Sequence, residues 1–167
     1  MNASDPSAPD PSATEASAPE PSAPDPDALD PDALARACAD AMWAEDVASQ
    51  QLGMRIVDVG AGRATVAMPL RAEMLNGHGI AHGGFVFALA DSAFAFACNS
   101  RNVRSVAYAC VITFLAPVGG DEELVASAVE QSLVGRTGTY DVTVTASGQV
   151  VAEFRGTSRT VGGHWWD

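Results

Sequence analysis

The sequence has no lysine and little positive charge of any kind. Its nine basic residues are all arginines, against 21 acidic residues, and the formal net charge is −12. Affinity for nucleic acids is built from clustered Lys and Arg side chains that face the phosphate backbone. No such cluster occurs, so we expect no nucleic-acid partner, and any anionic ligand must be met by a few local arginines.

Cysteine is scarce, and long hydrophobic runs are missing. Cys38, Cys98 and Cys110 are an odd number, lie far apart and form no Cys-x-x-Cys pair, which is typical of reduced thiols in a cytoplasmic protein. No uninterrupted apolar run reaches the ~18 residues of a membrane span. The N-terminus shows neither the basic nor the apolar segment of a secretory signal. We therefore expect a cytoplasmic protein without a membrane partner.

Proline is rare outside the N-terminal part of the chain. Residues 1–31 contain eight of the ten prolines and repeat Pro, Ser, Ala and Asp or Glu. Frequent prolines and like charges oppose both regular secondary structure and collapse. The sequence thus predicts a disordered tail over residues 1–31 and one folded domain over residues 32–167.

The apolar pattern after the tail predicts two helices and six strands. Helical spacing marks residues 32–51, and residues 85–99 are apolar on nearly every face, as in a helix buried on all sides. Runs rich in β-branched residues, bounded by turn residues, predict strands over 54–59, 63–70, 105–115, 123–133, 137–146 and 150–160. Because strands joined by tight turns are antiparallel, the expected fold class is α+β, with one antiparallel sheet wrapped around one long helix.

Two apparent motifs have simpler interpretations. Residues 57–62 resemble a nucleotide-binding glycine loop, but the residues that follow alternate like a strand instead of forming the required helix, which favours a hairpin. His78 and His82 have the spacing of metal ligands on a helix, but the glycines at 77 and 79 disfavour a helix there. We therefore expect no metal and no separate cofactor.

The glycines before the central helix and one acid inside it are the candidate catalytic elements. Glycines at positions 83 and 84 allow a ligand to approach the first amides of the helix, whose free N–H groups suit an oxygen that becomes anionic. Asp91 lies in an otherwise apolar helix, where an unpaired carboxylate is costly. It is either a general base or nucleophile in a desolvated pocket, or a structural carboxylate bonded to a neighbouring amide.

The spacing of these two elements predicts a dimer. Gly83 and Asp91 are eight residues apart, so they lie ~12 Å apart along one helix, whereas a base must lie ~3 Å from the group that it deprotonates. A two-fold dimer with the helices side by side would bring Gly83 of one subunit to Asp91 of the other.

At these residues the sequence resembles the hotdog-fold acyl-CoA thioesterases of the PaaI type, the phenylacetic acid degradation thioesterases. The matching segments span about residues 52–163 and are Met74-Leu75-Asn76-Gly77-His78, His82-Gly83-Gly84, Leu89-Ala90-Asp91-Ser92-Ala93-Phe94, Ala97-Cys98-Asn99-Ser100, Phe114-Leu115-Ala116-Pro117, Gly138-Thr139-Tyr140-Asp141 and Phe154-Arg155-Gly156. The resemblance implies the hotdog fold and a homodimer or homotetramer with shared active sites. It also implies hydrolysis of phenylacetyl-CoA and hydroxyphenylacetyl-CoA to CoA and the arylacetic acid.

The resemblance also implies roles for single residues. Asp91 matches the carboxylate that activates water or attacks the thioester, the Gly83 amide matches the oxyanion donor, and Asn76 matches a residue that positions substrate or water. His82 matches the histidine beside that glycine, with either a structural or a direct role. The candidate substrate-binding residues are Gly84, Phe85, Met74, Phe94 and Tyr108 around the acyl group and Arg136 at the CoA phosphates.

Three other functions remain open from the sequence. A non-catalytic acyl-CoA-binding module is compatible with the same fold, and so is a thioesterase for medium-chain acyl-CoA. A hydratase acting on enoyl-CoA is disfavoured, because its usual Asp and His pairing along the helix is missing: no histidine follows Asp91 before His164.

Overall fold

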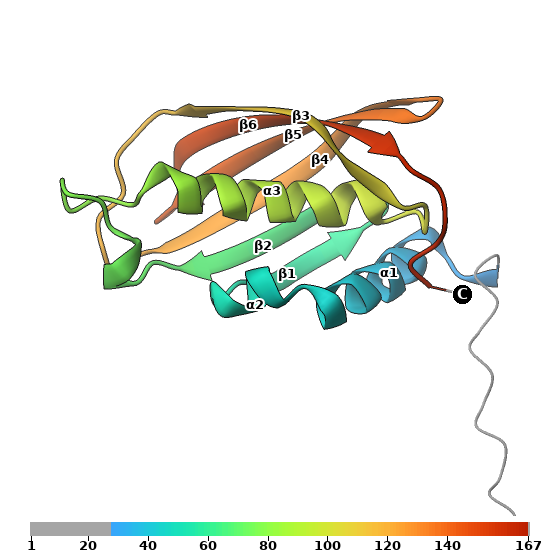
Figure 1. The fold of residues 1–167 in the computed structure, drawn as a ribbon, viewed down its shortest axis with the longest axis horizontal. Helices are drawn as coiled ribbons and strands as arrows, with labels where there is room; N and C mark the ends of the chain where they lie inside the picture. Colours follow the sequence, from blue (N-terminus) through green and yellow to red (C-terminus); the bar gives the residue numbers. More distant parts are fainter. Residues whose placement is uncertain (1–27, 167) are drawn as a thin grey trace, which may run out of the picture.

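The computed structural model describes residues 28–166, and its elements follow the predicted order (Figure 1). They are α1 (Pro31–Glu45), α2 (Val47–Gln51), β1 (Arg55–Gly60), β2 (Arg63–Pro69), the 3-10 turn η2 (Ala72–Met74), α3 (Gly83–Asn99), β3 (Ser105–Phe114), β4 (Glu123–Val134), β5 (Thr137–Ala146) and β6 (Gln149–Thr160). The tail is predicted over residues 1–31; of these, residues 1–27 lie outside the described residues, and Pro31 is already the first residue of α1.

The six strands form one antiparallel sheet that curves around α3. The strand order is β1-β2-β4-β5-β6-β3, and α3 crosses one face of the sheet, with α1 and α2 beyond β1 (Figure 1). The core fills the space between this face and α3, with Phe94 packed edge-on against the ring of Tyr140 at 5.4 Å. The predicted α+β class, with a sheet wrapped around one buried helix, is confirmed.

The predicted helix over residues 32–51 differs from the structure at two points. The helix begins one residue earlier, because Pro31 takes the first helical position and the Asp30 carboxylate accepts hydrogen bonds from the next two amides. It is also divided at Asp46, whose side chain accepts a hydrogen bond from the Ser49 N–H and so starts a new short helix. Aspartate competes in this way with the regular helical pattern.

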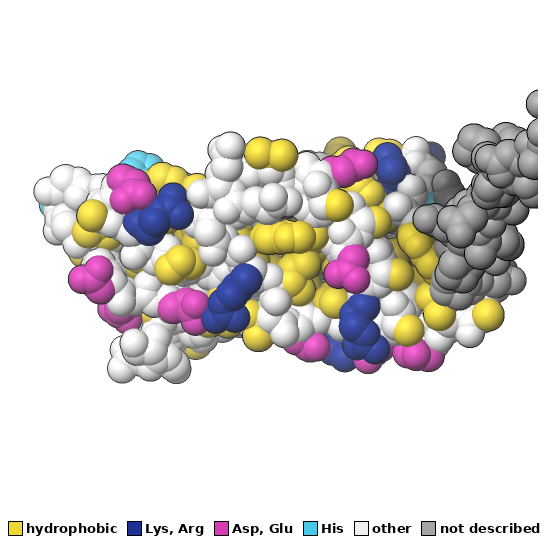
Figure 2. Space-filling model, turned by 90° about the horizontal axis from the view of Figure 1, so that it is seen from below, with side chains coloured by type: hydrophobic (Ala, Val, Ile, Leu, Met, Phe, Trp, Pro, Cys, Tyr) yellow, Lys and Arg dark blue, Asp and Glu magenta, His cyan; other side chains and the backbone are white. Residues whose placement is uncertain are grey.

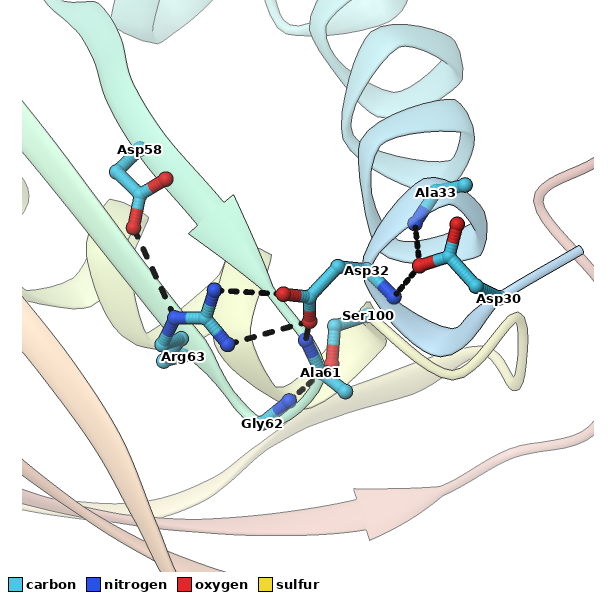
Figure 3. Close-up of polar contacts among 8 residues, drawn as sticks. All are labelled: Asp30, Asp32, Ala33, Asp58, Ala61, Gly62, Arg63 and Ser100. Carbon is cyan, nitrogen blue, oxygen red and sulfur yellow. Dashed lines mark hydrogen bonds and ion pairs between the residues drawn. The ribbon is translucent and has the colours of Figure 1, made fainter.

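The β1–β2 hairpin is tied to the start of α1 and to the end of α3 (Figure 3). The Asp32 carboxylate accepts the Ala61 N–H at 2.9 Å and pairs with the Arg63 guanidinium at 2.8 Å. The next amide, Gly62 N–H, donates to the Ser100 hydroxyl at 2.8 Å, just beyond the end of α3. Residues 57–62 are therefore a strand and a hairpin turn, as predicted, and not a nucleotide-binding loop.

The Asp32 contacts predict a stability difference that depends on pH. Hydrogen bonds from Arg63 and Ala61 lower the pKa of Asp32 from 3.8 to about 2, so its contribution is present above pH 3.8 and is lost as the pH falls towards 2. We expect Asp32→Asn to lower Tm at neutral pH, with a difference from the wild type that shrinks over this interval in calorimetric scans. Asp58→Asn is the matched control, because Asp58 contacts the same guanidinium at 3.7 Å. An equal effect of both variants at every pH would contradict this account.

The surface in Figure 2 carries charges of both signs close together. Ion pairs of this kind join Arg55 to Glu123 and Arg71 to Glu73. Such alternation leaves no continuous basic face in this view.

No helix within residues 28–166 combines the length and apolar character that crossing a bilayer requires.

Candidate active site

The N-terminus of α3 presents a free backbone donor. The helix begins at Gly83, two residues before the predicted start, because His82 caps it: its Nδ1 accepts the Gly84 N–H at 3.0 Å. The Gly83 N–H has no hydrogen-bond partner among residues 28–166. This amide therefore remains available to an external acceptor, at the positive end of the helix dipole.

The loop before α3 holds Asn76 beside this amide. The Asn76 Oδ1 accepts the His78 N–H at 2.9 Å, and the Asn76 backbone N–H donates to the Ile80 carbonyl at 2.8 Å. The turn between them needs Gly79, whose φ is +72°. Because Oδ1 is used within the loop, the Asn76 Nδ2 group is left to donate to a bound molecule.

Asn76 and Gly83 line one cleft of about 470 Å³. Its other walls come from the loop, the first turn of α3, the end of β3 and β6: Ile80, Ala81, Val86, Phe114, Leu115, Ala116, Pro117, Val118 and Val151. The Phe114 ring lies so close to Gly83 that a Cβ at that position would be 2.9 Å from its Cζ. Glycine at position 83 thus leaves room for this ring beside the free amide.

Asp91 is on α3 but does not line this cleft. Its side chain is half-buried, and its Oδ1 lies 3.9 Å from the thiol of Cys110 on β3. Burial raises the pKa of Asp91 above 3.8, and the thiol contact opposes that shift. The two catalytic candidates, Asp91 and Gly83, are separated along the helix as predicted, so one chain alone does not bring them together.

The structure disperses the predicted substrate-binding residues. Met74 and Phe94 are core side chains, with 0% and 1% exposure. The Gly84 N–H already donates to His82 Nδ1. The half-buried ring of Phe85 packs edge-on against the His82 ring, with 6.1 Å between the ring centroids. None of these four lines the cleft formed by Gly83.

The last two predicted binding residues lie on other surfaces. Tyr108 is 68% exposed on the edge strand β3, with its ring 5.0 Å from the Arg159 guanidinium. Arg136 donates to the Thr160 carbonyl at 2.7 Å and lines a separate hollow with Arg101. Within one chain, neither residue lies beside Asn76 and Gly83, so their roles in substrate binding stay predictions.

Sequence reasoning missed two contributors to the site. Phe114 forms a wall of the cleft, and Cys110 touches the Asp91 carboxylate. Both residues lie on β3, where every second side chain points toward α3. The alternation of the strand indicates that Cys110, Ile112 and Phe114 share one face. Only the strand register shows that this face points toward Asp91.

The arrangement suits attack on a carbonyl group in an apolar cleft. The free Gly83 amide and the Asn76 side chain are donors of the kind that stabilise a developing oxyanion. The half-buried Asp91 carboxylate, which lies outside this cleft within one chain, is a group of the kind that acts as a base or nucleophile. Within residues 28–166, no three His, Cys, Asp or Glu side chains converge as a set of metal ligands.

The chain is similar in sequence and in fold to known thioesterases. Residues 78–153 match the model of the Thioesterase superfamily. The acyl-coenzyme A thioesterase PaaI of Escherichia coli K12 is 44% identical over 126 residues, which cover 75% of this chain and 90% of the relative. The structure of E. coli PaaI, from the phenylacetic acid degradation operon, superimposes with a TM-score of 0.80 at 40% identity, over 81% of this chain and 99% of that chain.

Two further solved structures share the fold. A mutant structure of the phenylacetic acid degradation protein PaaI from Thermus thermophilus has a TM-score of 0.66 at 43% identity, covering 68% of this chain and 97% of that chain. A Streptococcus mutans protein bound to acetyl CoA has a TM-score of 0.64 at 26% identity, covering 66% of this chain and 90% of that chain.

The sheet wrapped around a helix with a free N-terminal amide is thus the hotdog fold of a thioester hydrolase. The chain belongs to the PaaI-type acyl-CoA thioesterases of the Thioesterase superfamily.

Proposed function

We propose that this thioesterase hydrolyses phenylacetyl-CoA and hydroxyphenylacetyl-CoA, giving CoA and the arylacetic acid. The observation that carries the proposal is the free Gly83 N–H at the rim of an apolar cleft of about 470 Å³. The substrate class is supported by the similarity to two PaaI proteins named for phenylacetic acid degradation. The phenyl ring of Phe114 in the cleft wall suits an aromatic acyl group, because aromatic rings pair favourably edge-on or offset.

In the proposed reaction, the thioester carbonyl oxygen accepts the Gly83 N–H and the Asn76 Nδ2–H. Asp91 removes a proton from water, whose oxygen attacks the carbonyl carbon. The tetrahedral intermediate then collapses, the C–S bond breaks, and the CoA sulfur takes the proton from Asp91. In a nucleophilic variant, the Asp91 carboxylate attacks the carbonyl carbon first, the C–S bond breaks and CoA leaves as its thiolate. Water then hydrolyses the resulting mixed anhydride to the arylacetic acid and free Asp91, and the thiolate takes the proton that this step releases. Both routes need an ionised Asp91, and neither uses a metal or a separate cofactor.

His82 has a positioning role in this proposal. Its Nδ1 accepts the Gly84 N–H, so the ring is a hydrogen-bond acceptor at the first turn of α3. This contact satisfies one amide and leaves the preceding one, Gly83 N–H, directed to the substrate.

The proposed active site is shared between two copies of the chain. Gly83 and Asp91 lie ~12 Å apart along α3, so the Asp91 that serves one Gly83 comes from the partner subunit. The edge of the sheet supports this dimer: in the described part of the chain, β3 is at the end of the strand order and exposes Val106 and Val111. A long, apolar edge strand is a ready surface for pairing with a second copy.

A medium-chain acyl-CoA is the second candidate substrate. The aliphatic side chains of Val86, Val118 and Val151 in the cleft favour it, since an unbranched acyl chain makes equally good contacts with them. The apolar cleft alone does not distinguish the two classes.

Thiol release from a panel of acyl-CoA thioesters tests the substrate class. We expect kcat/KM for phenylacetyl-CoA and hydroxyphenylacetyl-CoA to exceed that for hexanoyl-CoA or octanoyl-CoA by about tenfold or more, the scale of discrimination that apolar pockets reach. Phe114→Leu is the probe variant, because it keeps an apolar wall but removes the ring. It should lower kcat/KM for the aryl substrates more than for the straight-chain ones. Faster hydrolysis of the straight-chain substrates by the wild type would assign the second candidate instead.

A further inference from the structure

We propose that Cys110 is a positioning residue for the reaction, which holds the Asp91 carboxylate by donating its S–H to Oδ1. The inference rests on the proposed function of Asp91. It adds a thiol on β3 to the proposed catalytic groups on α3.

The register of β3 places this thiol against α3. Ala107 pairs with Ser158 and Ala109 with Thr157 of β6, so Tyr108 is the extra residue of a bulge that shifts the alternation of the strand. Beyond the bulge, Cys110 pairs with Gly156, whose missing Cβ leaves room for the Phe94 ring of α3. Cys110 therefore faces the helix, and its Sγ lies 3.9 Å from Asp91 Oδ1.

The protonation states of the thiol and the carboxylate decide which of them donates the hydrogen bond. Burial and the neighbouring Asp91 raise the pKa of Cys110 to about 11, so the thiol keeps its proton at neutral pH and the carboxylate accepts it. Among residues 28–166, the other titratable group whose pKa the Asp91 charge raises is Cys98 on α3, and burial is the main cause that raises this pKa to about 12. Both surrounding thiols are therefore neutral, and Cys110 is the one whose hydrogen bond favours the ionised carboxylate.

The contact also leaves one carboxylate oxygen for the reaction. Among residues 28–166, Cys110 is the one side chain that hydrogen-bonds to Asp91, and it does so at Oδ1. Oδ2 is then the oxygen that takes the proton of water or attacks the thioester. An S–H donor is weak compared with an amide or hydroxyl, so it orients the carboxylate without strongly lowering its basicity.

The test is the pH dependence of kcat/KM with phenylacetyl-CoA, or with the best thioester of the panel, for Cys110→Val and Cys110→Ser. The acid limb of this profile is the pH range in which kcat/KM falls because Asp91 becomes protonated. The valine variant removes the donor and keeps an apolar side chain at this position, so we expect the acid limb to move up by about half a pH unit. Below the limb, kcat/KM would then fall about threefold. The serine variant retains a donor, so its limb should remain at or below the wild-type position. Cys98→Ala is the matched control, because that thiol donates to the Ala95 carbonyl and should not move the limb.

A spectroscopic signature separates this role from a packing role. The S–H stretching band of Cys110 in Raman spectra should shift on Asp91→Asn, with Cys38→Ala and Cys98→Ala used to remove the other two thiol bands. A valine variant that lowers kcat/KM equally at all pH values, together with an unchanged S–H band, would overturn the role of Cys110. Unchanged turnover in Asp91→Asn would instead overturn the proposed function, so the two failures are distinguishable.

Discussion

Asp91→Asn should lower kcat for thioester hydrolysis by about 10³-fold or more. The amide has nearly the shape of the carboxylate but cannot accept a proton from water or act as a nucleophile, so the chemical step loses its base. The half-buried position makes this substitution easy to accommodate, because it removes a charge that burial disfavours. We therefore expect Tm to stay the same or rise while turnover is lost.

Steady-state thiol release and calorimetry measure the two effects on the same samples. Asp40→Asn is the matched control, because it makes the same change at an exposed position on α1 and should leave kcat unchanged. Retention of at least a tenth of wild-type kcat in Asp91→Asn would contradict a catalytic role. Asp91 would then be a structural carboxylate, and the base would have to be sought elsewhere.

Gly83→Pro should reduce kcat by about 10²- to 10³-fold, the scale seen when one oxyanion donor is removed. Proline lacks the N–H but suits this position, since it is the first of α3 and His82 before it is extended with ψ of 128°. Gly83→Ala is the matched control, because it adds the same Cβ near the Phe114 ring and keeps the N–H. The difference between the two variants isolates the hydrogen bond from the steric contact.

Mixing the two inactive chains tests whether the site is shared. In a dimer of one Gly83→Pro and one Asp91→Asn chain, a site built from both subunits is intact once, with Gly83 from one chain and Asp91 from the other. Random pairing of equal amounts should therefore restore about a quarter of wild-type activity. Co-expression with two affinity tags would give the mixed dimer directly, at about half of wild-type activity per dimer. If each chain carried a complete site, no mixture would exceed the two parent variants.

The folded elements were predictable because their signals are local. The apolar run at residues 85–99 indicated a buried helix, and alternation with turn residues located all six strands, β5 with the bounds that the structure shows. Errors occurred where one side chain competes with the regular pattern: Asp46 divides the first helix, and the His82 cap moves the start of α3 to Gly83. Such caps depend on a single hydrogen bond, so they change boundaries without changing the order of elements.

The candidate site was predictable only in part. Asn76 and Gly83 lie close in sequence and meet in one cleft, as expected from a loop that leads into a helix. The apolar residues that line the pocket were less predictable, because the core and the pocket walls are built from the same types of side chain. Met74 and Phe94 are buried in the core, while Phe114 lines the cleft.

The sequence by itself determined the α+β class, the order of elements, and the separation of Gly83 and Asp91 along one helix, which follows from the rise per residue. Tertiary structure alone decided what touches these residues. The bulge in β3 turns Cys110 toward Asp91, and the sheet curvature brings Phe114 to Gly83. Contacts between distant segments depend on the register of the strands, because a shift of one residue turns every side chain of a strand to the opposite face of the sheet.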